Sequence, residues 1–221
     1  MTQRDRKNTI IDLLSQVESL PFGEIPNDEL IQGFISVWDN GGWPAQLSYI
    51  KAVLEACISA NKPILECGSG VTSLLASVVL KRADIEVHSL EHEKDWADEV
   101  NFYKQQANIT NLYVHYCPLR SYDDYDWYTI PKNLPDSFSV VICDGPPGAT
   151  KGGRFGLLPC LINRLSKAVV LLDDFDRPGE QAIIKKWREA WGLDIKAQKS
   201  ITQAFGMGIV SAPENVHSQT Q

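Results

Sequence analysis

From residue 63 onward, short apolar runs alternate with segments of helical periodicity. Strand-length runs stand at 63–66, 85–90, 112–116, 138–143 and 168–172, and helices are expected at 72–82, 94–107, 156–165 and 178–191. Two final strands, about 194–198 and 205–211, have no helix between them, so we expect them to pair antiparallel. Such alternation is typical of a parallel sheet with helices on both faces. We therefore predict a three-layer α/β/α sandwich with a mostly parallel sheet of about seven strands, the last of them antiparallel.

The first 60 residues have a different pattern, from which we expect a helical cap. Apolar residues recur at helical spacing in 8–20, 28–38 and about 45–60. Trp38 and Trp43 flank the loop between the last two helices, so this cap is expected to cover the mouth of a site; the alternative is that it only seals the sheet edge. The sandwich is expected over residues 61–212, followed by a flexible tail at 213–221.

The composition narrows the classes of partner. The net charge of −7 opposes a nucleic-acid partner, which needs a basic face. The five cysteines are widely spaced, odd in number and without a CxxC pair, as in a reduced cytoplasmic protein. No signal-peptide core or bilayer-length apolar run is visible. We expect a cytoplasmic protein with a small-molecule substrate and no membrane partner, and we leave a homodimer open.

A glycine loop follows the first strand, where ligands of parallel sheets bind. Residues 66–70 read Glu-Cys-Gly-Ser-Gly, and Gly68 and Gly70 would let the backbone approach a ligand closely. The third position of a GxGxxG pattern is Ser73, so the match is incomplete and a plain strand-to-helix turn is the alternative.

A carboxylate ends the second strand. Glu91 lies 23 residues after Gly68, where an acid accepts hydrogen bonds from two ribose hydroxyls. Enzymes that use NAD and enzymes that use S-adenosylmethionine share this arrangement, and a surface acid is the bland alternative. His92 directly follows Glu91 and is placed to touch the edge of an adenosine.

Glu66 favours S-adenosylmethionine over a dinucleotide. It lies two residues before Gly68, where a carboxylate suits the cationic amino group of S-adenosylmethionine and would repel a pyrophosphate. The stretches ECGSG, SLEHEKDWADEV and VVICDGPPGA resemble the first, second and fourth motifs of class I S-adenosylmethionine-dependent methyltransferases, which have a Rossmann-like fold. The resemblance covers about residues 60–211. Within this family, the chain is distantly similar to the catechol O-methyltransferase group.

The resemblance implies a set of cofactor-binding residues. The first motif would hold the methionine end of the cofactor, and Glu91 with His92 would hold the adenosine. The residues after strand three would line the adenine. The acid after strand four would lie near the methyl group. The implied residues are Glu66, Gly68, Ser69, Gly70, Thr72, Glu91, His92, Pro118, Leu119 and Asp144.

The segment DGPPGATKGGRFG is the main candidate for chemistry on the acceptor. Asp144 is our candidate to orient or deprotonate the acceptor, and Arg154, with Lys151, to clamp an anionic substrate. A mobile surface loop with incidental charge is the alternative.

Three acids follow strand five in the stretch LLDDFDRPGE. Asp144 with Asp173 and Asp174 could make an oxygen-rich Mg²⁺ site, and Asp174 is a further catalytic candidate. Asp176 could instead simply cap the next helix. The catechol O-methyltransferase pattern has an acid-amide pair here and a lysine three positions after the strand-four acid. This chain has Phe175 in place of the amide and Pro147 in place of the lysine, so Mg²⁺ is possible but doubtful.

These patterns predict an S-adenosylmethionine-dependent methyltransferase that acts on a small molecule, with a hydroxyl as one candidate acceptor. The aromatic stretch 118–128 is either a wall of the binding site or ordinary packing. Two alternatives stay open: an NAD-dependent oxidoreductase, and a protein that binds an adenosyl ligand without catalysis.

Overall fold

A seven-stranded sheet forms the centre of the protein in a computed structural model, which describes residues 2–38, 45–198 and 204–211. The strand order is β3-β2-β1-β6-β7-β9-β8. Parallel pairing runs from β3 to β7, and β9 is antiparallel to both of its neighbours. The strands are β1 (Ile64–Cys67), β2 (Val87–Glu91), β3 (Leu112–Tyr116), β6 (Val140–Cys143), β7 (Val169–Leu172), β8 (Lys196–Gln198) and β9 (Phe205–Ile209). The predicted three-layer sandwich, Rossmann-like with an antiparallel last strand, is confirmed.

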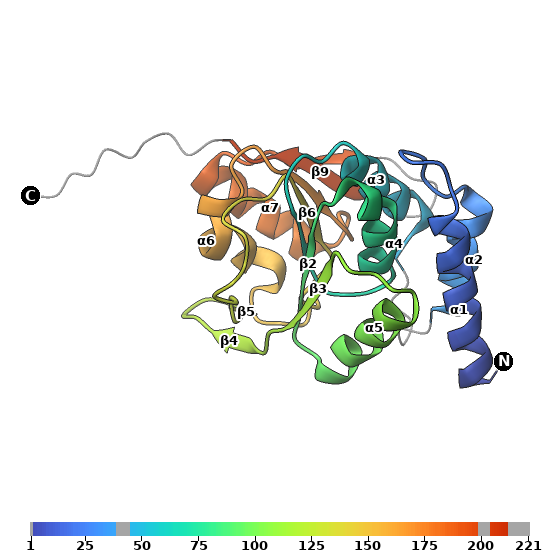
Figure 1. The fold of residues 1–221 in the computed structure, drawn as a ribbon. Helices are drawn as coiled ribbons and strands as arrows, with labels where there is room; N and C mark the ends of the chain where they lie inside the picture. The colour runs from blue at the N-terminus through green and yellow to red at the C-terminus, as the bar shows by residue number, and fades with distance from the viewer. Residues whose placement is uncertain (1, 39–44, 199–203, 212–221) are drawn as a thin grey trace, which may run out of the picture.

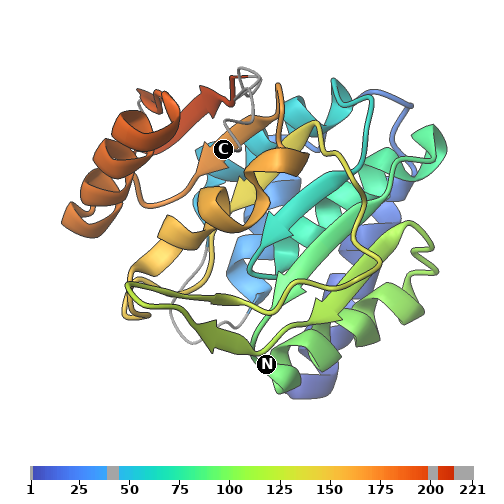
Figure 2. The same ribbon diagram turned by 90° about the vertical axis from the view of Figure 1, so that its left-hand side faces the viewer.

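Helices cover both faces of the sheet, as Figures 1 and 2 show. One apolar core joins α1–α5 to one face, and a second core joins α6 and α7 to the other. The helices are α1 (Gln3–Glu18), α2 (Asp28–Val37), α3 (Leu47–Ile58), α4 (Val71–Leu80), α5 (Lys94–Gln106), α6 (Leu157–Leu161) and α7 (Pro178–Trp191).

The first helix begins earlier than its apolar pattern predicts, at Gln3 and not near residue 8. Thr2 and Asp5 form a capping box in which each side chain accepts a hydrogen bond of 3.1 Å from the backbone of the other. The helix buries Ile10, Leu14 and Val17 in the core that also contains α4 and α5. The N-terminal helices thus pack in one layer of the sandwich; that they form a cap over the mouth of a site stays a prediction.

Two parts of the chain differ from the expected elements. The segment expected as a loop up to 137 contains a small hairpin of β4 (Leu119–Ser121) and β5 (Asp126–Tyr128). The helix expected over 156–165 is divided into a 3₁₀ turn at Gly153–Gly156, α6, and a second 3₁₀ turn at Ile162–Arg164. By contrast, α7 has the predicted bounds, because Pro178 begins it and Gly192, at φ 67°, ends it.

The strand order reverses between β1 and β6. The chain leaves β1 towards β2 on one side, whereas β6 continues towards β7 on the other. Cys67 and Cys143 are paired at the carboxyl ends of these two strands. Ligands of open α/β sheets bind outside such a switch point, so this edge is where a site is expected.

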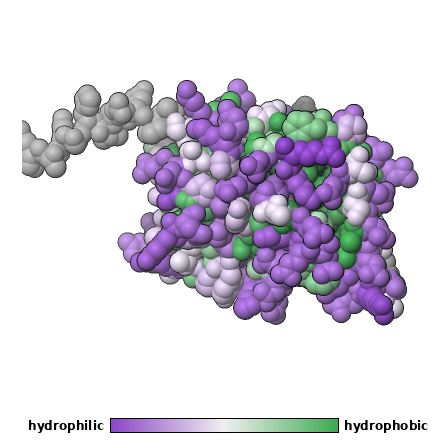
Figure 3. Space-filling model, viewed as in Figure 1, coloured by the Kyte–Doolittle hydropathy of each residue, from purple (hydrophilic) through white to green (hydrophobic). Residues whose placement is uncertain are grey.

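The face of the molecule shown in Figure 3 is mainly polar. In the view of Figure 3 hydrophilic residues predominate and apolar residues form small, separate areas. None of the described helices combines the length and the apolar character needed to cross a bilayer.

Candidate active site

A cavity of about 440 Å³ opens at the carboxyl ends of β1, β2, β6 and β7. Its walls come from the loop after β1, the end of β2, the segment after β6 and the acids after β7. Among the residues lining it are Gly68, Ser69, Gly70, Thr72, Glu91, His92, Asp144, Arg154, Asp173 and Asp174. The topology therefore brings together most of the residues that the sequence singled out.

The glycine loop runs close to the segment after β6. Gly68 has φ 89°, a left-handed conformation that favours glycine. A methyl group added at Gly68 would lie 3.1 Å from the backbone nitrogen of Gly145, so the two strand ends touch through their backbones. A methyl group added at Gly70 would meet no protein atom within 4 Å. Gly70 thus borders open space in the wall of the cavity.

The backbone amides of this loop already have partners within the chain. Ser69 N donates to Glu91 Oε2 at 2.9 Å, and Gly70 N donates to Ser73 Oγ at 2.9 Å. In a dinucleotide loop such amides meet a pyrophosphate. Because the amides of Ser69 and Gly70 already donate to Glu91 and Ser73, they are not available to bind a pyrophosphate.

Glu91 is a buried carboxylate with many donors. Its Oε1 accepts from the amides of His92 at 2.7 Å and Glu93 at 2.9 Å, and its Oε2 also accepts from Ser69 Oγ at 3.0 Å. Burial alone would raise the pKa of Glu91, but hydrogen bonds from His92, Glu93 and Ser69 outweigh it, so the pKa lies below its usual value. The group is therefore ionised at neutral pH, and its carboxylate reaches the cavity wall.

Glu66 is buried next to the cavity and is not among the residues that line it. Its side chain is fully buried and accepts hydrogen bonds from the hydroxyls of Thr72, Ser73 and Ser89. Thr72 and Ser73 stand in the first turn of α4, so Glu66 ties the end of β1 to that helix. Burial raises the pKa of Glu66 to about 7, although the three hydroxyls lower it. Glu66 does not line the cavity in this structure, and a direct contact with a ligand stays a prediction.

The pKa of Glu66 predicts how stability depends on pH. Between 4.5, its ordinary value, and about 7, the folded state keeps a proton that the unfolded chain has released. The free energy of unfolding therefore falls as pH rises through this window, by about 3 kcal/mol at most. Glu66→Gln is expected to reduce the fall measured by urea unfolding at pH 5 and pH 8, while the raised pKa values of Asp144 and Asp173 keep their own share of it. The matched control is the exposed Glu55→Gln, which should keep it, and an unchanged fall in Glu66→Gln would contradict the assignment.

Aromatic side chains form the wall next to Glu91. Trp96 Nε1 donates to Ser69 O at 2.5 Å, and the rings of His92 and Tyr128 meet edge to face at 6.1 Å. Glu91 raises the pKa of His92, whose Nδ1 lies 3.1 Å from Glu91 Oε1. Tyr128 is fully buried, lines the cavity, and its hydroxyl has no hydrogen-bond partner among the described residues. Tyr128 therefore borders the cavity with a buried polar atom that the described residues leave unpaired.

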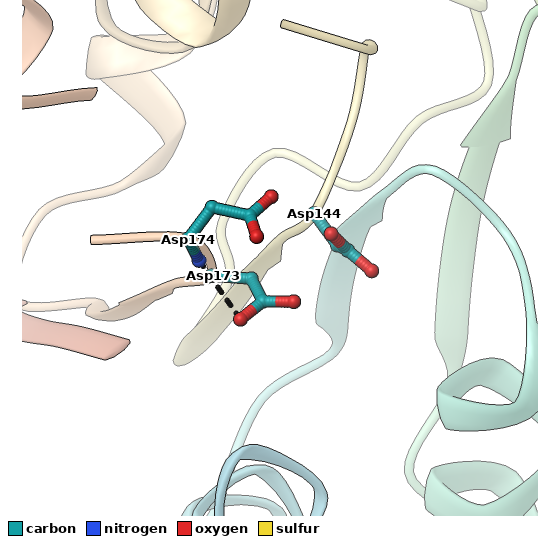
Figure 4. Close-up of side chains that lie close together, drawn as sticks. All are labelled: Asp144, Asp173 and Asp174. Atoms are coloured by element: carbon teal, nitrogen blue, oxygen red, sulfur yellow. Dashed lines mark hydrogen bonds between the residues drawn. The ribbon is translucent and has the colours of Figure 1, made fainter. Parts of the chain in front are cut away.

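Three aspartates gather between the ends of β6 and β7. Figure 4 shows Asp173 and Asp174 extending towards Asp144, and one carboxylate oxygen of each lies within 4.8 Å of the others. Asp174 has φ 58°, a left-handed conformation that is uncommon outside glycine. Burial and the charge of Asp173 raise the pKa of Asp144, which Arg154 only partly offsets. Burial and the charge of Asp174 likewise raise the pKa of Asp173.

Comparison with known proteins supports the fold. No protein-family model and no curated protein matches the chain. Solved structures do match: a cofactor-bound structure of Rv0187 from MTB has 15% identity and a TM-score of 0.59, covering 93% of this chain and 90% of that one. An O-methyltransferase from Bacillus cereus in complex with SAH has 14% identity and a TM-score of 0.55, covering 91% and 90%. A methyltransferase from Pyrococcus furiosus has 16% identity and a TM-score of 0.53, covering 94% and 98%.

The chain has the class I methyltransferase fold. On this fold the cavity lies at the switch point, with the glycine loop and Glu91 on one side and Asp144 on the other. The match fits the resemblance read from the three sequence motifs.

The methyltransferase fold places some expected residues outside the cavity. Pro118 and Leu119 are not among its lining residues, because the chain turns there into the β4–β5 hairpin. Lys151 Nζ donates to Asp123 O at 2.6 Å on the surface. Arg154 lines the cavity but is buried against acids and is not part of an exposed basic loop. Trp38 lines the cavity, whereas Trp43 lies outside the described residues.

Several lining residues were not singled out in the sequence. They are Ala45, Gln46, Val71, Glu93, Trp96 and Arg177. Trp96 had a usable signal, since it stands five residues after Glu91 in the first turns of α5. The aromatic stretch 118–128, which contains Tyr128, could be read from the sequence as ordinary packing or as a wall of the binding site. The position of Tyr128 at the cavity favours the wall.

Proposed function

We propose that this chain is an S-adenosylmethionine-dependent methyltransferase that acts on a small-molecule acceptor, with a hydroxyl as the first candidate. The observation that carries the proposal is the cavity at the switch point of a class I methyltransferase fold, which the glycine loop, Glu91 and Asp144 line together. A cytoplasmic location and a homodimer belong to the same proposal; the free state of all five cysteines supports the former.

The charge of the cavity suits S-adenosylmethionine better than NAD. Carboxylates outnumber guanidinium groups in its lining: Glu91, Glu93, Asp144, Asp173 and Asp174 against Arg154 and Arg177. A sulfonium cation is attracted by such a wall, and the two phosphates of a dinucleotide are repelled. The engaged amides of Ser69 and Gly70 act in the same direction.

The residues present fit the adenosyl ligand. Glu91 would accept hydrogen bonds from ribose hydroxyls, the rings of His92 and Trp96 would pack near the adenine, and Gly70 leaves room for the ligand. When bound, the sulfonium supplies an electrophilic methyl group. The chain contributes orientation, because in-line placement of the reacting atoms supplies much of the rate enhancement.

Asp144 is placed to accept the proton of the acceptor. Its side chain is 32% exposed, whereas those of Asp174 and Glu180 nearby are under 10%. A cavity of about 440 Å³ is of the size that holds small ligands. The net charge of −7 opposes a nucleic-acid acceptor.

The unpartnered hydroxyl of Tyr128 gives a prediction for affinity. Tyr128→Phe is expected to weaken the binding of S-adenosylhomocysteine by about tenfold, because the ligand loses one hydrogen bond while the fold loses none. Calorimetric titration measures the change. Tyr125→Phe is the matched control, since the Tyr125 hydroxyl faces Cys160 outside the cavity. Equal affinities for Tyr128→Phe and the unaltered protein would remove Tyr128 from the binding site.

The proposed acceptor class can be tested by isotope transfer. The purified protein is incubated with methyl-labelled S-adenosylmethionine and a cell extract divided into low-mass and macromolecular fractions. Label in the low-mass fraction, lost in Asp144→Asn, is expected. Label that appears only in protein or nucleic acid would overturn the small-molecule assignment.

A further inference from the structure

A buried arginine lies inside the aspartate cluster. The Nη2 atom of Arg154 is 3.1 Å from Asp144 Oδ1 and 2.8 Å from Asp174 Oδ2. The same nitrogen donates to Asp144 O at 2.8 Å, and Nη1 donates to Asp173 O at 2.6 Å. Arg154 is only 2% exposed. A single guanidinium therefore joins the ends of β6 and β7.

The chain holds Arg154 in this place from two sides. It stands in the 3₁₀ turn Gly153–Gly156, which follows Gly152 at φ 73° and begins with Gly153 at φ 52°. Glu180, buried in the first turn of α7, has its Oε1 3.9 Å from Arg154 Nη1. The carboxylates, Asp144 foremost, outweigh the burial of Arg154, so the guanidinium stays charged.

A divalent ion does not fit the same carboxylates while Arg154 is there. An ion bridging Asp144 and Asp174 would need the space between Asp144 Oδ1 and Asp174 Oδ2, where Nη2 already lies. Mg²⁺ also needs near-octahedral oxygen ligands at about 2.1 Å. An ion beside the cluster would be repelled by a guanidinium a few ångströms away in a partly buried site. Arg177 Nη1 binds Asp174 Oδ2 from the outer side at 2.7 Å and adds a second positive charge.

We propose that Arg154 is the resident cation of this site, so that the three aspartates hold a guanidinium of their own chain and bind no divalent metal. The guanidinium offsets part of the negative charge of the cluster and fixes the carboxylate of Asp144 through Oδ1. Arg154 is thus a positioning residue for Asp144.

The consequence for the reaction rests on the proposed function. Asp144 Oδ2 makes no hydrogen bond to the described residues, so it is the oxygen left for the acceptor. A bond forms between the acceptor oxygen and the methyl carbon, the carbon–sulfur bond breaks, and its electron pair stays on sulfur. The proton of the acceptor hydroxyl passes to Asp144 Oδ2. No ion is needed to balance this step.

Mn²⁺ binding, followed by electron paramagnetic resonance, tests the resident cation directly. The unaltered protein is expected to bind no Mn²⁺ at millimolar concentration. Arg154→Ala leaves Arg177 at Asp174 as the remaining cation of the three carboxylates and is expected to gain at least tenfold in Mn²⁺ affinity, with a rise in melting temperature on adding the metal. Arg154→Met, which keeps the volume of the side chain, covers the case in which the alanine variant does not fold. Arg177→Ala is the matched control: it removes a cation from Asp174 but leaves Arg154, and should gain no Mn²⁺.

Stoichiometric Mn²⁺ binding by the unaltered protein, lost in Asp144→Asn, would overturn the proposal. Absence of any gain in a folded Arg154→Met variant would also overturn it, since the cluster would then have no affinity that Arg154 blocks. Binding of S-adenosylhomocysteine is measured on the same preparations. If the protein does not bind S-adenosylhomocysteine, the proposed function is refuted, but the conclusion that Arg154 excludes a divalent metal is unaffected.

Discussion

Glu91→Gln is expected to lower the affinity for S-adenosylhomocysteine by about ten- to a hundredfold. The carboxylate accepts from the amides of Ser69, His92 and Glu93 and lines the cavity. A glutamine presents one oxygen and one NH₂ group, so a backbone donor would face another donor and the bond to ribose would lose its charge. Hydrogen bonds to charged groups contribute roughly 1.5–3 kcal/mol each, which corresponds to this range.

The control for this effect is Glu99→Gln. Glu99 lies on α5 and pairs with Arg6 at 3.1 Å, away from the cavity, so calorimetry should give the affinity of the unaltered protein. Thermal unfolding shows whether each variant is folded. A folded Glu91→Gln protein with undiminished affinity would show that Glu91 only braces the loop.

Gly145→Ala is expected to destabilise the protein by about 1–3 kcal/mol or more, as overpacking of a tight contact does. The added methyl group would lie 2.9 Å from Gly68 Cα and 3.1 Å from Cys67 O, and it would also overlap Tyr128 Oη. Two of these atoms are backbone and cannot rotate aside, so the ends of β1 and β6 would have to separate. Urea unfolding measures the loss of stability.

Gly70→Ala is the matched comparison in the same wall. Its methyl group would meet no atom within 4 Å, and its φ of 178° is ordinary extended backbone. We expect a stability change within about 0.5 kcal/mol but a weaker affinity for S-adenosylhomocysteine, because the methyl group takes space meant for the ligand. If Gly145→Ala were as stable as Gly70→Ala, the close approach of the two strand ends would be wrong.

The layout of the fold was readable because its signals are local. Apolar runs of strand length separated by amphipathic segments predicted the parallel sheet, and Pro178 with Gly192 marked the bounds of α7. The β4–β5 hairpin was missed because each strand has only three residues and β4 is largely exposed, so neither has an apolar period.

From the sequence, the residues of the site could be predicted only where they directly follow a strand. Gly68, Glu91 and Asp144 meet there because parallel strands end at one edge of the sheet. The direction of Glu66 was not evident, since it depends on which face of β1 the residue occupies and on the hydroxyls of α4 that donate to it. The burial of Arg154 likewise depends on the 3₁₀ turn that brings it against the aspartates. In a sequence, an arginine that will be buried looks the same as one that will be exposed.

The measurement that tests the central claim most directly is calorimetric titration of the unaltered protein with S-adenosylhomocysteine and, separately, with NAD⁺. The account predicts micromolar binding of S-adenosylhomocysteine, no binding of NAD⁺, and no dependence on Mg²⁺. Binding of NAD⁺ alone would contradict the conclusion that the hydrogen-bonded loop amides and the acidic lining exclude a pyrophosphate. Binding of neither ligand would contradict the assignment of the cavity to an adenosyl ligand.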